Sequence, residues 1–222
     1  MDKWEGILNK MDNKLGKFIV FEGIDGSGTT TQAELLKNYL LDIGFSAITT
    51  TEPSSGPIGN LIREGFKKRV VFIEEDKLFD EQMAYLFAAD RHDHIYNEVD
   101  GIKTLNSQSI TTISTRYFFS SLVYHVNNEE EYDFVKKLNE KFPLPDLTIY
   151  IDNPIEISMK RIAQRAHRDT YENEKKLISV KENYKRVFQE FNKNLLIIDG
   201  NNTIENIHQQ ILKRVKELYG NL

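Results

Sequence analysis

The sequence of 222 residues contains no cysteine, which excludes disulfide bonds and thiolate metal sites. It has no run of about 18 apolar residues that could cross a membrane, and its charged first residues lack the apolar stretch of a signal peptide. Positive charge is not in excess either, because Asp and Glu outnumber Lys and Arg and the net charge is −5. Such an acidic chain is a poor partner for nucleic acid or an anionic membrane surface. We therefore expect a cytoplasmic protein that binds neither nucleic acid nor a membrane.

Linkers rich in proline, glycine or serine are absent too, and the length fits one α/β domain or at most two small ones. Five short apolar runs have the composition of strands covered on both faces, and helical patterns separate them. The runs occupy residues 18–21, 47–51, 110–114, 147–151 and 195–198, and the helical patterns occupy 30–41, 75–98, 129–141, 154–165, 174–191 and 203–219. This alternation predicts a doubly wound five-stranded parallel sheet flanked by helices, with a ligand crevice at the carboxyl ends of the strands.

A glycine-rich turn follows the first apolar run and opens the first helical pattern. Glycines allow successive backbone N–H groups to surround phosphate oxygens, and a helix N-terminus adds a favourable dipole. The lysine of the usual phosphate-loop pattern is absent, because Thr29 stands in its place, whereas Thr30 stands where a Mg²⁺-binding hydroxyl belongs. The turn alone leaves open both a nucleotide site and a purely structural role. The candidate phosphate-binding residues are Gly23, Ile24, Asp25, Gly26, Ser27, Gly28, Thr29, Thr30 and Thr31.

Five segments of the chain resemble the thymidylate kinase family, in the family's order and at fitting intervals. They are FIVFEGIDGSGTTTQ (18–32), TEPSSGPIGNLIR (51–63), LFAADRH (86–92), TRYFFSSLVYH (115–125) and PDLTIYI (145–151). A phosphate loop alone is a weak signal, whereas five ordered matches spread over residues 17–220 are specific. The resemblance implies a single P-loop kinase domain over 17–222 that transfers the γ-phosphoryl group of ATP to dTMP, with Mg²⁺ as cofactor. Residues 1–16 lie outside it, as an N-terminal extension of unknown role.

The resemblance implies particular roles for side chains on the dTMP side. Asp25 matches an acid that faces the sugar and phosphate of dTMP, and Arg63 and Arg116 match arginines that hold the phosphate. Phe87 matches the ring that stacks on thymine, and Arg91, on the same helix face, matches the side chain that reaches the base edge. The other expected dTMP-binding residues are Pro53, Ser121, Tyr124 and His125.

Two of these side chains carry expectations about selectivity. Tyr124 matches a residue that stands where a ribose 2′-hydroxyl would lie, so deoxynucleotides are expected to be preferred. His125 stands where the family usually has glutamine. An imidazole at this place is expected to become charged as the pH falls, which would lower the selectivity for thymine.

The expected catalytic residues are Asp25, Arg116 and two arginines of a lid at about 165–173, namely Arg165 and Arg168. Gly26 and Ser27 bring no cation into the phosphate loop. The cation at the transition state must then come from the lid, as in the bacterial-type members that the chain resembles. Thr30 is the candidate Mg²⁺ ligand. Members of the family are typically homodimers, so the expected partners are dTMP, ATP and a second copy of the chain.

Four threonines depart from the family pattern: Thr29 replaces a lysine, Thr51 an arginine, Thr115 an aspartate and Thr170 a lid arginine. Three cations and one anion are thereby lost, and three of the four losses are expected to affect the binding of ATP, the binding of Mg²⁺ or the transfer step. We favour an active kinase in which lid arginines and Mg²⁺ take over the work of the lysine. A nucleotide-binding protein with impaired phosphoryl transfer and a kinase for another nucleoside monophosphate stay open as alternatives.

Simpler roles also stay open for several of these side chains. Phe87 could belong to the core, and Arg63 and Arg91 could each pair with a neighbouring acid such as Glu64 or Asp90. A solvated helix end could account for the group Arg161, Arg165, His167 and Arg168.

Overall fold

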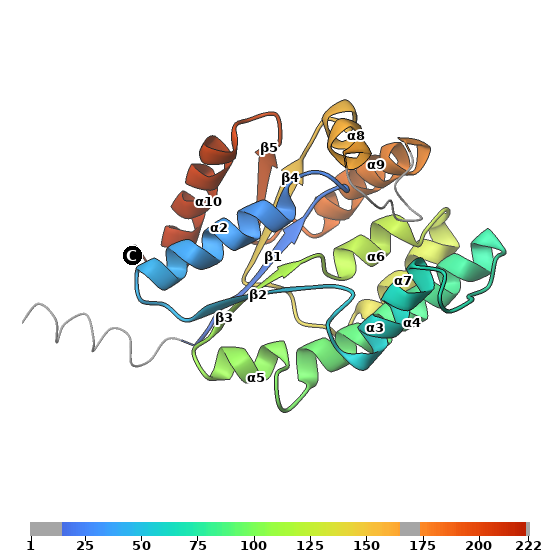
Figure 1. Ribbon diagram of the computed structural model, residues 1–222, viewed down its shortest axis with the longest axis horizontal. Helices are drawn as coiled ribbons and strands as arrows, with labels where there is room; N and C mark the ends of the chain where they lie inside the picture. Colours follow the sequence, from blue (N-terminus) through green and yellow to red (C-terminus); the bar gives the residue numbers. More distant parts are fainter. Residues whose placement is uncertain (1–14, 165–173, 221–222) are drawn as a thin grey trace, which may run out of the picture.

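The computed structural model describes residues 15–164 and 174–220. In this part of the chain, five parallel strands form one sheet in the order β2-β3-β1-β4-β5 (Figure 1). The strands are β1 (Phe18–Glu22), β2 (Ala47–Thr51), β3 (Thr111–Thr115), β4 (Leu147–Asp152) and β5 (Leu195–Asp199). The predicted five-stranded parallel sheet is therefore confirmed, and each strand agrees with its predicted run to within one residue at either end.

Helices connect the strands. Within the described ranges they are α2 (Thr29–Asp42), α3 (Pro57–Phe66), α4 (Asp76–Tyr96), α5 (Ile102–Ser107), α6 (Phe118–Tyr124), α7 (Glu129–Asn139), α8 (Ile155–Ala163), α9 (Glu174–Glu190) and α10 (Ile204–Leu218). The sequence patterns predict all of these except α3, α5 and α6. Helix α6 escapes prediction because six of its seven side chains are buried, so the polar face that reveals a surface helix is missing.

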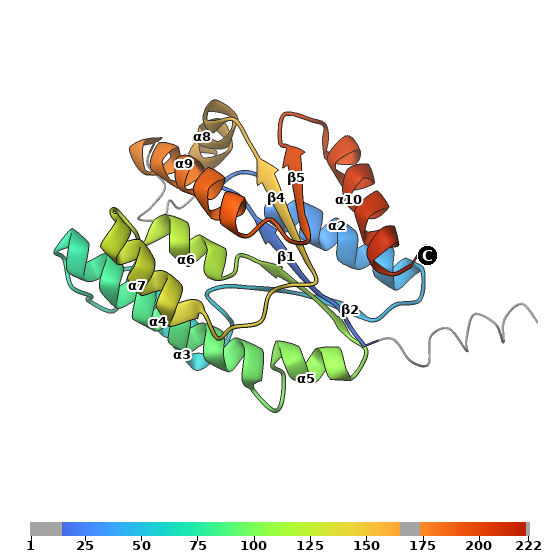
Figure 2. The same cartoon turned by 180° about the vertical axis from the view of Figure 1, so that it is seen from behind.

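Two layers of helices cover the sheet, one on each face (Figures 1 and 2). Successive side chains of β1 point to opposite faces, as in any strand. Ile19 and Phe21 pack with residues of α2 and α10 in one apolar cluster. Phe18 and Val20 belong to a second cluster, which includes residues of α4, α6, α7 and α9. All four of these β1 side chains are apolar and enter one cluster or the other, which explains why residues 18–21 read as an unbroken apolar run.

The loops that carry the predicted site follow the carboxyl ends of three neighbouring strands. Strand β1 runs into the glycine-rich turn, where Gly26 and Gly28 have φ values of 80° and 96°, a left-handed conformation that glycine adopts without a Cβ clash. Strand β2 runs into the segment that contains Pro53, and β3 runs into Arg116. Because these strands pair in register up to their last residues, the three loops meet at one edge of the sheet.

Candidate active site

Described residues line two adjoining cavities at this edge of the sheet. The first, which we call the aromatic pocket, has a volume of about 310 Å³, and the second, the loop pocket, about 300 Å³. Asp25 and Arg116 line both cavities, which therefore join at this pair. The aromatic pocket is lined by Asp25, Glu52, Pro53, Arg63, Phe66, Lys67, Phe87, Arg116, Tyr117, Ser120, Ser121, Tyr124 and His125. The loop pocket is lined by Ile24, Asp25, Gly26, Gly28, Thr29, Thr30, Thr31, Thr51, Thr115, Arg116 and Arg161.

Phe87 of α4 forms an apolar wall of the aromatic pocket. The centre of its ring lies 5.2 Å from that of His125, at an interplanar angle of 42°, and 6.4 Å from that of Phe66. Met83, one helical turn earlier, is completely buried, whereas Phe87 is half-buried and faces the cavity. Phe87 is therefore a pocket residue and not only a core residue. A cavity with a flat aromatic wall and a few polar groups suits a planar ring.

Asp25, Arg116 and Tyr124 form a closed hydrogen-bonded set where the two pockets join. Nη2 of Arg116 donates to Oδ1 of Asp25 at 2.5 Å and to the hydroxyl of Tyr124 at 3.3 Å. The Tyr124 hydroxyl in turn donates to Oδ2 of Asp25 at 2.8 Å. Burial alone would lower the pKa of Arg116, but the charge of Asp25, together with smaller contributions from Tyr124, Tyr184 and Glu22, outweighs burial and raises that pKa well above its ordinary value. Arg116 is thus a fixed cation, the kind of group that binds phosphate.

Arg63 of α3 brings a second guanidinium into the aromatic pocket. Its Nη1 donates to the backbone oxygen of Ser54 and its Nη2 to that of Pro53. The neighbouring acid Glu64 pairs instead with Lys67, at 3.1 Å. Because carbonyl oxygens orient a guanidinium without neutralising it, Arg63 keeps its positive charge for an anion in the pocket.

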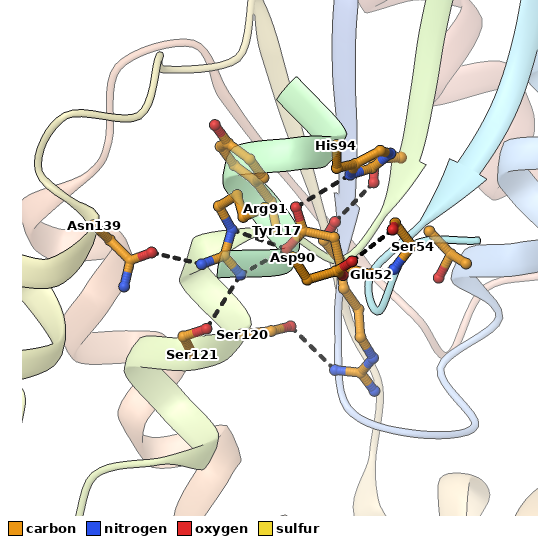
Figure 3. Close-up of polar contacts among 12 residues, drawn as sticks. Glu52, Ser54, Asp90, Arg91, His94, Tyr117, Ser120, Ser121 and Asn139 are labelled. Carbon is orange, nitrogen blue, oxygen red and sulfur yellow. Dashed lines mark hydrogen bonds and ion pairs between the residues drawn. The ribbon is translucent and has the colours of Figure 1, made fainter. Parts of the chain in front are cut away.

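The pocket lining includes every predicted dTMP-binding residue except Arg91, which is completely buried and whose polar contacts Figure 3 shows. Its Nε and Nη2 donate to Oε2 of Glu52 at 2.9 and 2.6 Å, its Nη1 to Asn139 at 2.5 Å, and its Nη2 also to Ser121 at 3.2 Å. Asp90, the expected alternative partner, bonds to the loop after β2 instead. Contact between Arg91 and a base therefore stays a prediction, while Glu52 and Ser121 link Arg91 to the pocket wall.

His125 is buried, and this burial lowers the pKa of its imidazole to about 3, with smaller contributions from the positive charges of Lys176 and Arg91. The ring is therefore neutral throughout the pH range in which enzymes normally work. The expectation that His125 becomes charged as the pH drops below neutrality is wrong. It assumed the ordinary pKa of an exposed imidazole, and burial stabilises the neutral form instead.

Arg161 of α8 supplies a cation to the loop pocket. The sequence analysis groups it with Arg165 and Arg168 but gives it no specific role. Its Nη1 donates to the backbone oxygen of Gly26 at 3.0 Å and lies 3.4 Å from that of Ser27. The strand order brings Arg161 to this place: β4 pairs with β1, so the helix after β4 begins beside the phosphate loop. Sequence alone does not reveal that order.

Two of the departures from the family pattern lie next to each other on the wall of the loop pocket. Thr51 and Thr115 are register partners on β2 and β3, and the Thr51 hydroxyl donates to the backbone oxygen of Thr115 at 3.0 Å. The arginine and the aspartate that the family pattern has at these positions are thus replaced by a neutral pair.

The residues of the loop pocket fit Mg²⁺ only in part. Across 15–164 and 174–220, no group of three or more His, Cys, Asp or Glu side chains is arranged to hold a metal ion. Thr30 is exposed and lines the cavity together with the carboxylate-bearing Asp25. Mg²⁺ typically takes one or two protein ligands besides substrate phosphates and waters, so this sparse set of oxygens suits it when phosphates are present.

The predicted lid at 165–173, with Arg165, Arg168 and Thr170, lies outside the described residues, as do residues 1–14 of the N-terminal extension. The described part contains no helix that is long and apolar enough to span a membrane. The sequence analysis also missed five residues that line the aromatic pocket, namely Glu52, Phe66, Lys67, Tyr117 and Ser120. Four of them are next to a predicted site residue or on α3 or α6, helices that the patterns do not predict, and Lys67 is the C-cap of α3.

Comparison with known proteins places the chain among its relatives. It matches the family model for thymidylate kinase over residues 21–211. A protein of Methanococcus aeolicus described as a "probable thymidylate kinase" is 38% identical over 208 residues, which cover 91% of this chain and 97% of that protein. A protein of Pyrococcus horikoshii with the same description is 37% identical over 207 residues, covering 92% and 98%. The structure of thymidylate kinase from Candida albicans is similar in fold, with a TM-score of 0.73 and 24% identity over 93% of each chain.

Proposed function

Because this chain belongs to the thymidylate kinase family and converts dTMP to dTDP with ATP, we propose that dTMP occupies the aromatic pocket and that the ATP phosphates occupy the loop pocket. The observation that carries this assignment is the pair Asp25 and Arg116, which lines both cavities. A phosphoryl group that passes between two nucleotides has to cross such a junction. The flat wall of one pocket and the backbone N–H groups of the other suit a base and a phosphate chain, respectively.

In the aromatic pocket, thymine stacks on Phe87, and Arg63 and Arg116 hold the dTMP phosphate as charge-assisted donors. Arg91 reaches the base edge, and its bond to Ser121, which lines the pocket, supports this part of the proposal. As a pure donor, a guanidinium can pair with O4 of thymine but not with the amino group of cytosine. The remaining proposed contacts are Pro53, Tyr124 and His125.

In the loop pocket, backbone N–H groups at the start of α2 hold the phosphates of ATP, and Arg161 adds positive charge beside them. Thr30 is the proposed protein ligand of Mg²⁺, which, when bound, neutralises charge on the phosphates. Arg165 and Arg168, in the lid proposed at 165–173, contribute further cations. The resemblance to the family supports the lid and the extent of the kinase domain over 17–222.

In the transfer itself, an oxygen of the dTMP phosphate attacks the γ-phosphorus of ATP. The bond between that phosphorus and the β–γ bridging oxygen breaks, and ADP leaves with the electron pair. The protein mainly positions two like-charged groups against each other and compensates their charge. Arg116 is suited to this task because Asp25 and Tyr124 fix its orientation before the substrates arrive.

We also propose that the protein works as a homodimer in the cytoplasm. The family resemblance supports both points, and the apolar side chains of Leu61 on α3 and of Leu78 and Tyr85 on α4 are between 41% and 51% exposed. A second copy of the chain could cover them. Light scattering of the purified protein tests the dimer: a mass of twice 25.9 kDa is expected, and a monomer at every concentration would reject it.

Acceptor specificity tests the assignment of the aromatic pocket. ADP release is measured with dTMP, dUMP, dCMP and dGMP as acceptors at a fixed ATP concentration. We expect dTMP to have the highest kcat/KM, with dUMP lower by roughly 10- to 100-fold, because it lacks only the thymine methyl group. The values for dCMP and dGMP should lie far below, because cytosine presents an amino donor where thymine presents O4 and guanine is a larger, two-ring base. If dCMP or dGMP were the better acceptor, the proposed pocket would be wrong although the fold would stand.

A further inference from the structure

Arg116 adopts a backbone conformation that needs support. Its φ of 74° is left-handed, a conformation that is unfavourable for a residue with a Cβ. Hydrogen bonds on both sides maintain this conformation: its N–H donates to the backbone oxygen of Phe21 at 2.8 Å, and its own backbone oxygen accepts from the Ser114 hydroxyl at 2.8 Å. Such strain persists only where the surroundings fix it, and it is concentrated at functional sites.

Glu22, the last residue of β1, has a completely buried carboxylate directly beside this turn. Oε1 of Glu22 accepts the backbone N–H of Tyr117 at 2.8 Å, which fixes the residue that follows Arg116. Oε2 accepts the hydroxyls of Ser120 at 2.8 Å and of Tyr184 at 2.7 Å. Burial raises the pKa of Glu22, whereas the charge of Arg116 and these hydrogen bonds oppose that rise. No part of the proposed transfer step uses Glu22, so its presence in the core calls for another reason.

Ser120 joins Glu22 to the guanidinium of Arg116. The Ser120 hydroxyl donates to Glu22 and accepts from Nη1 of Arg116 at 3.1 Å. Nη2 of the same guanidinium is bonded to Asp25. The two ends of the guanidinium fork are therefore fixed separately, one by Asp25 at the pocket junction and the other by Glu22 through Ser120.

Tyr184 completes this arrangement from α9, which begins directly after residues 165–173. Its ring is completely buried and lies 4.8 Å from that of Tyr150 and 5.5 Å from that of Phe188. These contacts give the Tyr184 hydroxyl a fixed position on Oε2 of Glu22. Tyr184 does not line either pocket, so any effect of it on a substrate has to pass through other residues.

From this geometry we infer that Glu22 and Tyr184 are positioning residues for the dTMP phosphate, acting through Ser120 on Arg116. The carboxylate of Glu22 holds the left-handed turn with one oxygen and orients the guanidinium with the other. Tyr184 fixes that second oxygen and thereby connects α9 to the phosphate-binding cation. The inference rests on the proposed role of Arg116 in binding the dTMP phosphate.

Tyr184→Phe tests the inference, since it removes one hydroxyl and keeps the ring. Titration calorimetry of the full chain should show dTMP binding weakened by about tenfold, the usual effect of losing a hydrogen bond to a charged group. Binding of a non-hydrolysable ATP analogue should change less than twofold. Tyr150→Phe is the matched control, because it removes a hydroxyl from the same buried ring stack but outside the relay, and it should leave both affinities unchanged. A purely structural role for Tyr184 would instead lower the melting temperature with no selective loss of dTMP affinity.

Arg116→Lys alone and combined with Tyr184→Phe separates this inference from the proposed function. If Tyr184 acts through the guanidinium, Tyr184→Phe should cost less than twofold in dTMP affinity once Arg116 is lysine. A full, additive loss in that background, or no loss from Tyr184→Phe in the parent protein, would overturn the positioning role alone. Unchanged dTMP binding by Arg116→Lys itself would reject the phosphate-binding role of Arg116.

Discussion

The two pockets offer different groups to the phosphates that we propose for them. In the aromatic pocket these groups are charged side chains, and other groups hold each of them: Arg63 is bonded to backbone oxygens and Arg116 to Asp25. The loop pocket is built largely from glycines, backbone N–H groups and five threonines, with Arg161 as a cation at its edge. Of the departures from the family pattern that the structure describes, Thr29, Thr51 and Thr115 fall in the loop pocket, and His125 falls in the aromatic pocket.

This difference shows where a phosphate site tolerates the loss of charged side chains. Backbone N–H groups and a helix dipole belong to the main chain, so a side-chain substitution leaves them in place. A base pocket depends on the shape and donor pattern of particular side chains, so few changes are neutral there. We therefore expect substitutions in the aromatic pocket to have larger effects than those in the loop pocket.

The largest effect is expected for Arg116→Lys. Lysine keeps the charge but loses the planar fork that bonds to Asp25, Tyr124 and Ser120 together. The value of kcat/KM for dTMP should fall by about 100-fold or more, while KM for ATP stays within about threefold. Steady-state ADP release measures both constants. Arg214→Lys, in an exposed ion pair with Glu217 on α10, is the control and should behave like the parent. Parent-like kinetics for Arg116→Lys would show that its guanidinium does not bind the acceptor.

The next effect in size is that of Phe87→Ala. Removal of the ring takes away the stacking surface, which is worth roughly 1–3 kcal/mol per base, or about 5- to 150-fold in dissociation constant. Titration with dTMP should show this loss, and titration with an ATP analogue should show none. Phe87→Tyr preserves the stacking face and should restore most of the affinity. An equal loss for both nucleotides would mean that the ring supports the fold and not the base.

A smaller effect is expected for Thr29→Ala, at the position where the family pattern has lysine. The threonine carries no charge, so kcat should fall less than tenfold, whereas Arg165→Ala or Arg168→Ala should cost about 100-fold. Single-turnover transfer from labelled ATP compares the three variants on the same step. A greater loss from Thr29→Ala than from either arginine variant would contradict the view that backbone and lid replace the lysine.

The smallest effect concerns pH. Because burial holds the pKa of His125 near 3, the imidazole is neutral at both pH 6 and pH 8, and it gains a proton only as the pH falls toward 3. The ratio of kcat/KM for dTMP to that for dCMP should therefore change less than twofold between pH 6 and pH 8 on account of this residue. His125→Gln provides the comparison, since it cannot titrate. A ratio that changes tenfold in the parent but not in His125→Gln would show that the ring titrates near neutrality.

The sequence predicts the sheet well because its strands are buried on both faces, and such strands read as apolar runs. The same burial hides helix α6, whose sequence FFSSLVY carries no helical alternation. Helix α3 begins at Pro57 immediately after a Ser-Ser-Gly segment, and those residues suggest a loop. The type of an element can thus be predicted where one periodicity dominates its sequence. It cannot be predicted from the pattern where packing buries a short helix on all sides.

The site is predictable to the extent that its residues follow strands or belong to motifs. Eight of the nine predicted dTMP-binding residues line one cavity, and only Arg91 does not. Its main partner, Glu52, is 39 residues away in the sequence, and no local pattern shows such a pair. The same reason explains why the sequence gives Arg161 no specific role and does not reveal Tyr184, because Arg161 reaches the site through the strand order and Tyr184 through helix packing. Glu22 did leave a signal, namely an acid at the end of an apolar strand, which is costly to bury without a purpose.

The arrangement of both substrates around Arg116 is tested most directly by the crystal structure of a complex with a bisubstrate analogue, in which thymidine and adenosine are joined through their 5′ positions by a chain of phosphates. The account predicts that thymine stacks on Phe87, that the phosphate next to thymidine bonds to Arg116 and Arg63, and that the remaining phosphates follow the N–H groups of the glycine-rich turn. An analogue bound with adenine against Phe87, or with its phosphates away from Arg116, would contradict it.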